Sequence, residues 1–271
     1  MRAYNQDGIP YFQFEHFPEN GRLQHAIFTR QGGVSPAPFD SLNLSLSVPD
    51  TKENVYKNRR LAYQLFDRRS ETVVHAHLVH GTAVARVTHA QNGTWVHHVD
   101  GLITDEPGCA LVMNYADCTP IFLYDPIHHA IGLGHAGWQG AVQNLPGALV
   151  QAMHAAFGSQ PADLLAGIGP TIGACCYEVG EPVISAVQNA FPDAWETLLV
   201  TPKKPRPFSL GGRPHFDLPE ANRLNLLRAG IPESHIHDTG FCTACRTDLF
   251  YSHRAERGKT GRFGTILMLG K

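Results

Sequence analysis

Long apolar runs, a secretion signal and a strong excess of one charge are all missing from this chain of 271 residues. No run approaches the roughly 18 to 20 apolar residues that a membrane-spanning helix needs. Residues 1–20 mix acidic and aromatic side chains and lack the basic start and apolar stretch of a secretion signal. The 22 basic and 24 acidic residues leave a net charge of -2, which disfavours nucleic acid or an anionic membrane as the main partner. We therefore expect a cytoplasmic protein that binds neither.

The composition is that of a folded globular domain, with 43% hydrophobic residues, 17% charged residues and a mean hydropathy of -0.18. A chain of this length buries a substantial core as one large domain or two small ones. Only residues 201–214, with prolines at 202, 205, 207 and 214, resemble a long loop. This stretch is too short and too central to separate two domains, so we predict a single domain over residues 1–271.

Strand-like and helix-like segments alternate irregularly along the chain. Strands are expected where short apolar runs are rich in branched residues, at 72–79, 83–87, 110–114, 121–124, 130–134, 164–168 and 264–269. Helices are expected at 54–66, 140–157, 181–190 and 218–229, the last beginning after a predicted N-cap at Asp217. This order predicts an α/β or α+β fold in which helices cover a mainly antiparallel or mixed sheet.

Six cysteines without a secretion signal are expected to be free thiols or metal ligands rather than a disulfide framework. Cys175 and Cys176 are adjacent and cannot usefully cross-link anything locally. Cys242 and Cys245 form a C-x-x-C motif, which is typical of half a zinc site or of a redox pair. Because the sequence holds no second C-x-x-C motif, we interpret this pair as a bystander without a catalytic role.

Three short motifs place a metal-binding side chain at the end of an expected strand. They are His80 before Gly81, Cys118 within residues 116–120, and His135 within residues 134–140. Two imidazoles and one thiolate suit Zn²⁺ and leave the fourth tetrahedral position open for water or substrate. The alternative is that both histidines are hydrogen-bonded edge residues and that Cys118 is a small buried hydrophobe.

Cys118 has a further interpretation as a thiolate nucleophile that a neighbouring imidazole keeps ionised. Asp117 is the nearest carboxylate, and it is either a general base or an aspartate that caps a turn. An anionic substrate such as phosphate requires hydrogen-bond donors. Four arginines next to glycine or polar turn residues qualify, namely Arg30, Arg246, Arg254 and Arg262.

Other histidines compete as ligands among the 16 in the chain. His75 and His77 lie two residues apart on an expected strand and share a face, which makes them a candidate chelating pair. The histidines at 97, 98, 128, 129, 235 and 237 are expected in solvated loops or edges. A multicopper centre is disfavoured, because the chain has only two H-x-H pairs and lacks both an H-C-H motif and an axial methionine after a ligand cluster.

Taken together, these motifs resemble the YfiH family, also called the laccase-domain or DUF152 family. The similarity runs through most of the chain, and so many matches in the same order make it highly specific. The matching segments are residues 28–35, 41–45, 58–60, 79–82, 100–104, 116–120, 135–138, 168–170, 175–180, 250–254 and 260–262.

Members of this family are described as purine nucleoside phosphorylases and were formerly described as polyphenol oxidases. The resemblance implies that a catalytic metal, usually zinc with copper also reported, is bound by His80, Cys118 and His135. We expect Cys118 and Asp117 to act in catalysis and Arg30, Asn43, Gln139 and Arg254 to contact the substrate. The expected substrates are phosphate and the purine nucleosides adenosine, inosine and S-methyl-5'-thioadenosine, with adenosine deamination as an added activity.

The fold implied by the resemblance is a single α/β domain of stacked mixed sheets and helices, related to a group of proposed cysteine hydrolases. Three positions depart from the family pattern: Leu78 stands in place of Gln, Gln139 in place of the Arg of H-A-G-W-R-G, and Ala255 in place of a second Arg. Gln139 replaces a permanent cation with a neutral amide, which weakens the expected phosphate site. Two other functions stay open, a copper-dependent phenol oxidase and a non-catalytic metal- or nucleoside-binding protein.

Overall fold

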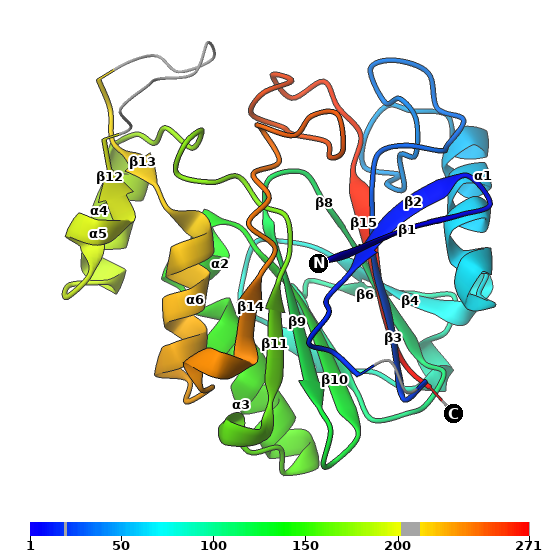
Figure 1. Ribbon diagram of the computed structural model, residues 1–271, viewed down its shortest axis with the longest axis horizontal. Helices are drawn as coiled ribbons and strands as arrows, with labels where there is room; N and C mark the ends of the chain where they lie inside the picture. The colour runs from blue at the N-terminus through cyan, green and yellow to red at the C-terminus, as the bar shows by residue number, and fades with distance from the viewer. Residues whose placement is uncertain (19–20, 202–211, 271) are drawn as a thin grey trace.

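Two mixed β-sheets lie face to face in the computed structural model, which describes residues 1–18, 21–201 and 212–270 (Figure 1). The seven-stranded sheet has the order β1-β2-β3-β15-β8-β4-β6. Its strands are β1 (Arg2–Gln6), β2 (Ile9–Gln13), β3 (Leu23–Phe28), β15 (Phe263–Leu269), β8 (Ala110–Tyr115), β4 (Val73–His77) and β6 (Trp95–His97). Only β4 pairs in parallel fashion in this sheet, with β8 and with β6.

The six-stranded sheet has the order β14-β11-β9-β10-β7-β5. Its strands are β14 (Ile236–Asp238), β11 (Leu165–Ile168), β9 (Thr119–Asp125), β10 (Ala130–Ala136), β7 (Gly101–Thr104) and β5 (Val84–Arg86). The edge strands β14 and β5 are parallel to their neighbours, and the inner pairs are antiparallel. A separate two-stranded ribbon joins β12 (Leu199–Val200) to β13 (His215–Phe216).

Helices cover the outer faces of both sheets, which gives four layers (Figure 1). Helix α1 (Lys52–Tyr63) packs on the seven-stranded sheet, and α3 (Leu145–Phe157) and α6 (Leu218–Arg228) pack on the six-stranded one. The remaining helices are α2 (Trp138–Val142), α4 (Glu181–Ala190) and α5 (Trp195–Leu198). Single 3₁₀ turns are η1 (Gln64–Phe66), η2 (Ser70–Thr72), η3 (His89–Gln91), η4 (Pro161–Asp163) and η5 (Glu233–His235).

Strand β8 shows why the central strands carry unbroken apolar runs. Ala110 and Val112 face the cluster under α1, whereas Leu111 and Met113 face the core between the sheets. Successive side chains of a strand point to opposite faces, so a strand that is covered on both sides must be apolar at every position. The expectation of a mixed α/β fold is therefore confirmed. The sequence was also compatible with a single sheet, and the structure has two stacked sheets.

Several expected elements are confirmed, and others differ at their ends. All seven expected strands form, and the predicted N-cap is present because Asp217 Oδ1 accepts the N–H of Glu220 at 3.2 Å. The expected helix 140–157 is interrupted at Asn144, which has a φ of 64°. Its side chain accepts the N–H of Gly147 and so caps a new helix, α3, that begins at Leu145. The expected helix 54–66 ends as α1 at Tyr63 and continues as η1. Most of the expected loop 201–214 lies outside the described residues.

None of the helices in the described part of the chain combines the length and the apolar character needed to cross a lipid bilayer.

The buried imidazole of His25 on β3 makes stability depend on pH. Its Nε2 accepts the backbone N–H of Phe14 at 2.8 Å, which requires the neutral ring. Burial, assisted by the positive charge of a protonated His16, lowers the pKa of His25 to about 3 from an ordinary value near 6.5. At a pH between these two pKa values, His25 is therefore protonated in the unfolded chain and neutral in the folded chain.

We expect the free energy of unfolding to fall as the pH drops from about 6.5 toward 3, by up to about 1.4 kcal/mol per pH unit from His25. Denaturant unfolding at several pH values measures this slope. In the variant His25→Gln the side-chain oxygen still accepts from Phe14 but does not titrate, so the slope should be shallower. Equal slopes in the two proteins would contradict the assignment to His25.

Candidate active site

A cavity of about 610 Å³ opens at one edge of the stacked sheets and contains the expected ligand residues. His80 lies three residues beyond the end of β4, Cys118 lies between β8 and β9, and His135 is the next-to-last residue of β10. One donor atom from each of the three lies within 4.8 Å of the others. The rings of His80 and His135 are 5.0 Å apart between centroids and nearly perpendicular. The structure thus brings together the three expected ligand residues from distant parts of the chain.

The backbone at His80 explains how it joins this group. By the two-residue period of a strand, His80 belongs to the face opposite His75 and His77, but β4 already ends at His77. His80 has a φ of 61°, in the left-handed region that side chains other than glycine seldom adopt. Such a residue costs on the order of 1–3 kcal/mol and is held by its surroundings.

Asp100, directly before β7, supplies that hold. Its Oδ1 accepts the N–H of His80 at 3.0 Å, and its Oδ2 accepts the N–H groups of Val79 and Gly81 at 3.1 and 2.8 Å. Nδ1 of His135 also lies 3.0 Å from Asp100 Oδ1. Because a carboxylate only accepts hydrogen bonds, Nδ1 of His135 carries the proton. The other ring nitrogen, Nε2, is therefore left for a metal. Burial raises the pKa of Asp100, but these hydrogen bonds outweigh it and hold the pKa below its usual value.

Cys118 and His135 shift each other's pKa within the cluster. Burial opposes ionisation of the Cys118 thiol, but the positive charge of His135 and hydrogen bonds from both histidines lower its pKa to about 6. Burial likewise disfavours the His135 cation, yet the Cys118 thiolate and Asp100 raise the pKa of His135 to about 9. The lowered pKa of Cys118 favours its thiolate form, which is the form that binds a metal or attacks an electrophile.

The donor set and its surroundings fit a metal ion. One thiolate and two imidazoles are ligands that zinc and copper share, and three protein ligands leave an open position. Gly137 faces the cluster, where an added Cβ would lie 2.9 Å from Cys118 Sγ and 3.3 Å from the ring of His80. Glycine at this position therefore keeps the space around the thiolate clear.

Asp117, the neighbour of Cys118, lines the cavity but is firmly held. It has a φ of 86°, and Oδ1 accepts the Thr243 hydroxyl at 2.6 Å while Oδ2 accepts the N–H of Arg254 at 2.7 Å. Burial raises the pKa of Asp117 despite these hydrogen bonds. The carboxyl group therefore holds its proton to a higher pH than an exposed aspartate does.

The four expected substrate contacts separate into two groups. Gln139 and Arg254 line the cavity, and the Arg254 guanidinium lies 5.1 Å from the ring of Tyr177 and donates to the Glu178 carbonyl at 2.6 Å. Arg30 does not line it. Its guanidinium donates to the carbonyls of Asp40 and Thr247 and to Glu256, and it stacks on Tyr251 at 4.5 Å.

Asn43 is also absent from the cavity wall and fully buried. Its Oδ1 accepts the N–H groups of Ser45 and Arg262, at 3.2 and 3.0 Å, and both of these residues do line the cavity. Arg30 and Asn43 thus lie outside the cavity wall, and their polar atoms hold neighbouring backbone in place. A sequence pattern does not distinguish a residue that contacts the substrate from one that supports neighbouring backbone.

The candidate chelating pair His75 and His77 does not form. His75 is buried and stacks on Trp95 with 4.5 Å between ring centroids, and burial holds the pKa of His75 well below its usual value. His77 lies at the exposed end of β4, near His97 at 5.5 Å between ring centroids. Neither belongs to a ligand cluster found among the described residues.

Sequence reasoning missed Asp100, Thr243 and Tyr177 as parts of the site. Asp100 lies in one of the matching segments but carries no local pattern that separates it from a turn aspartate. Tyr177 follows the vicinal pair Cys175 and Cys176, and its place in the cavity wall depends on the long connection after β11. Arg262, one of four candidate anion donors, lies in the wall, whereas Arg246 pairs with Asp248 at the surface.

Two stacked sheets with a His, Cys, His cluster in an edge cavity are the arrangement of a laccase-domain protein of the mixed α/β type. The chain belongs to the family described as multi-copper polyphenol oxidoreductase laccase, whose model matches residues 24–270. In the part of the chain that the structure describes, only two groups of three or more ligand residues occur, and only this one contains histidine.

Relatives of known name are similar over nearly their whole length. Purine nucleoside phosphorylase YlmD of Geobacillus stearothermophilus is 39% identical over 245 residues, covering 87% of this chain and 86% of that protein. A purine nucleoside phosphorylase of Bacteroides thetaiotaomicron is 32% identical over 265 residues, covering 95% and 96%. The crystal structure of YfiH from Bacillus licheniformis superimposes with a TM-score of 0.88 at 33% identity, covering 97% of each chain.

Proposed function

We propose that the protein is a metal-dependent purine nucleoside phosphorylase that acts on adenosine, inosine and S-methyl-5'-thioadenosine. The observation that carries this proposal is the convergence of His80, Cys118 and His135 in a cavity that Arg254 and Arg262 also line. A volume of about 610 Å³ is within the range of small-molecule sites. The names of the similar proteins support the same reaction.

His80, Cys118 and His135 would hold the metal, with zinc as the first choice because of the thiolate and the open position. When bound, zinc supplies a Lewis acid that stabilises negative charge on an oxygen or nitrogen of the substrate. Asp100 orients both imidazoles by accepting from His135 Nδ1 and from the backbone around His80.

Phosphorolysis exchanges one bond at the ribose. The bond between C1′ and the purine nitrogen breaks with its electron pair going to the purine, a phosphate oxygen bonds to C1′, and the purine gains a proton. The guanidinium groups of Arg254 and Arg262 bind and orient the phosphate, and Gln139 adds a neutral donor. Asp117, whose pKa is raised by burial, acts as the acid that gives the purine its proton, and it regains a proton from the hydrogen phosphate whose oxygen bonds to C1′.

Product analysis with and without phosphate tests this proposal. Inosine should yield hypoxanthine and ribose 1-phosphate only when phosphate is present, and conversion of adenosine to inosine without phosphate would reveal the proposed deaminase activity. We expect Gln139→Arg to raise phosphorolysis relative to deamination by roughly 10-fold, since a charged hydrogen bond to phosphate replaces a neutral one. Gln143→Arg, at an exposed position outside the cavity wall, is the matched control for added charge.

Each outcome separates the alternatives. An unchanged ratio in Gln139→Arg would show that residue 139 does not contact phosphate. The family description favours one second candidate, a copper-dependent phenol oxidase. Phenol oxidation with added copper, together with no turnover of nucleosides under either condition, would replace the phosphorylase with that oxidase. Binding of metal and nucleoside without any turnover would indicate a non-catalytic binding protein.

A further inference from the structure

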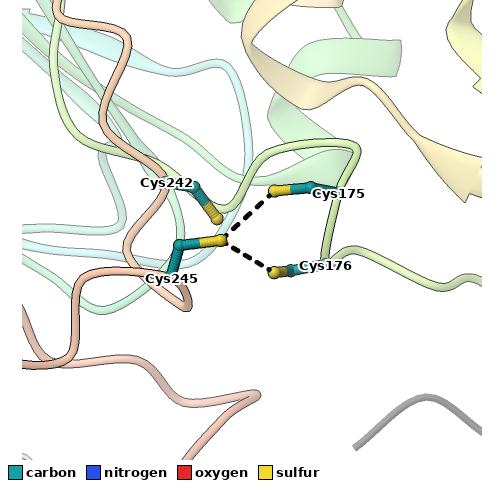
Figure 2. A group of neighbouring side chains, drawn as sticks. All are labelled: Cys175, Cys176, Cys242 and Cys245. Atoms are coloured by element: carbon teal, nitrogen blue, oxygen red, sulfur yellow. Dashed lines mark hydrogen bonds between the residues drawn. The ribbon is translucent and has the colours of Figure 1, made fainter. Parts of the chain in front are cut away.

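Four cysteines from two distant segments meet in one place outside the active site (Figure 2). Cys175 and Cys176 lie in the connection between β11 and α4, and Cys242 and Cys245 lie in the connection between β14 and β15. Cys245 Sγ is 3.5 Å from Cys175 Sγ and 3.4 Å from Cys176 Sγ. All four sulfur atoms lie within 4.8 Å of one another. The vicinal pair therefore supplies the partner that the C-x-x-C motif lacks in the sequence.

We propose that Cys175, Cys176, Cys242 and Cys245 bind a structural Zn²⁺ ion. Four sulfurs at about 2.3 Å from a tetrahedral zinc ion are about 3.8 Å apart, close to the spacing of the thiols here. Four soft thiolate ligands select zinc over magnesium or calcium, which prefer oxygen. With four protein ligands no position is open for substrate, so the ion would stabilise the fold rather than act in catalysis.

The separations do not describe disulfides. Bonded sulfurs lie about 2.05 Å apart, and none of the six cysteines, all within the described residues, forms such a bond. Cys245 has two sulfur neighbours at nearly equal distance, whereas a disulfide would select one of them. The backbone N–H of Gly173 also donates to Cys242 Sγ at 3.3 Å, which is the kind of support that metal-bound thiolates receive.

An ion at this place would join two connections that form part of the active-site wall. The two segments already pair beside the cysteines, where Thr171 N–H donates to the Phe241 carbonyl at 3.2 Å and Thr243 N–H donates to the Thr171 carbonyl at 3.1 Å. The hydroxyl groups of Thr171 and Thr243 both hold Asp117, through its carbonyl and its carboxylate. The segments that carry the four cysteines are therefore connected, through Thr171 and Thr243, to Asp117, the residue before Cys118.

Metal content, rather than activity, tests the proposal. We expect the protein purified under reducing conditions to contain about one zinc ion per chain more than the double variant Cys242→Ser/Cys245→Ser, by elemental analysis. Cys109→Ala is the matched control, because Cys109 is buried and outside both clusters, and its zinc content should equal that of the wild type. The difference in zinc content does not depend on nucleoside turnover, so it tests the structural zinc site separately from the proposed phosphorylase activity.

A second measurement applies if the double variant fails to fold. Titration of the variant Cys118→Ala, which lacks the thiolate ligand of the active site, with a mercurial reagent should release one zinc ion as these four thiols react. Equal zinc content in wild type and double variant would overturn the proposal. The proposal would also be overturned if no zinc were released as the thiols react. A mass of the native protein that is lower than the sequence mass by the hydrogens lost in one or two disulfides would overturn it as well.

Discussion

Replacing Cys118 with alanine is expected to abolish nucleoside phosphorolysis and to lower the affinity of the active site for zinc by more than about 100-fold. Changes to residues that only support a ligand already cost about 10- to 100-fold, and Cys118 contributes the single negative charge among the three ligands. The loss also removes the thiolate that raises the pKa of His135 to about 9. Initial rates with inosine and phosphate, measured beside zinc content, check both effects.

The control for this substitution is again Cys109→Ala, which removes a thiol of the same kind from the core and should leave turnover unchanged. The pair of measurements also separates the two roles of Cys118. Loss of turnover with loss of metal assigns it as a ligand, whereas loss of turnover with the metal retained assigns it as a nucleophile. Full activity of Cys118→Ala would exclude both roles.

Asp100→Asn is expected to weaken zinc binding at the active site by about 10- to 100-fold, with turnover falling in step. The carboxylate accepts from four donors, and the NH₂ group of asparagine would face at least one of them. The variant therefore no longer fixes the backbone of His80, which is in the left-handed region, and no longer orients the ring of His135. Competition with a chromophoric chelator measures the affinity.

Asp105→Asn is the matched control, because Asp105 pairs with Arg86 at the surface and the same chemical change there should have little effect. Turnover of Asp100→Asn should recover in part at high zinc concentration, since the ligands themselves remain. Failure of added zinc to restore any turnover, in a folded protein, would show that Asp100 does more than orient ligands.

The seven expected strands were predictable because their apolar periodicity is local, whereas eight other strands in the described part of the chain, β1 among them, were not expected. The strands β8, β9, β10 and β15 are buried on both faces, so each is an apolar run that any sequence pattern records. Strand β1 was missed, because its side chains are mostly exposed and polar and its place is fixed by pairing with β2. The break at Asn144 was missed because apolar residues continue on both sides of it.

The three candidate ligands were predicted from residue type, from the glycine and proline residues that follow them, and from family resemblance. Their supporting residues were not, because Asp100 and Thr243 act through hydrogen bonds across 35 and 126 residues of sequence. The partnership of the vicinal cysteines with the C-x-x-C motif spans 69 and 70 residues, so no motif spacing predicts it. Long-range contacts of this kind depend on the order of strands in the sheets.

Strand β15 has a consequence for how the chain is made. It lies between β3 and β8 in the seven-stranded sheet, so that sheet stays divided until residue 269 has left the ribosome. Until then β3 and β8 each present an unpaired edge, and edges of this kind favour association with other chains. Arg262, directly before β15, enters the cavity wall at the same moment. A nascent chain therefore contains His80, Cys118 and His135 long before it has a closed sheet or a complete pocket.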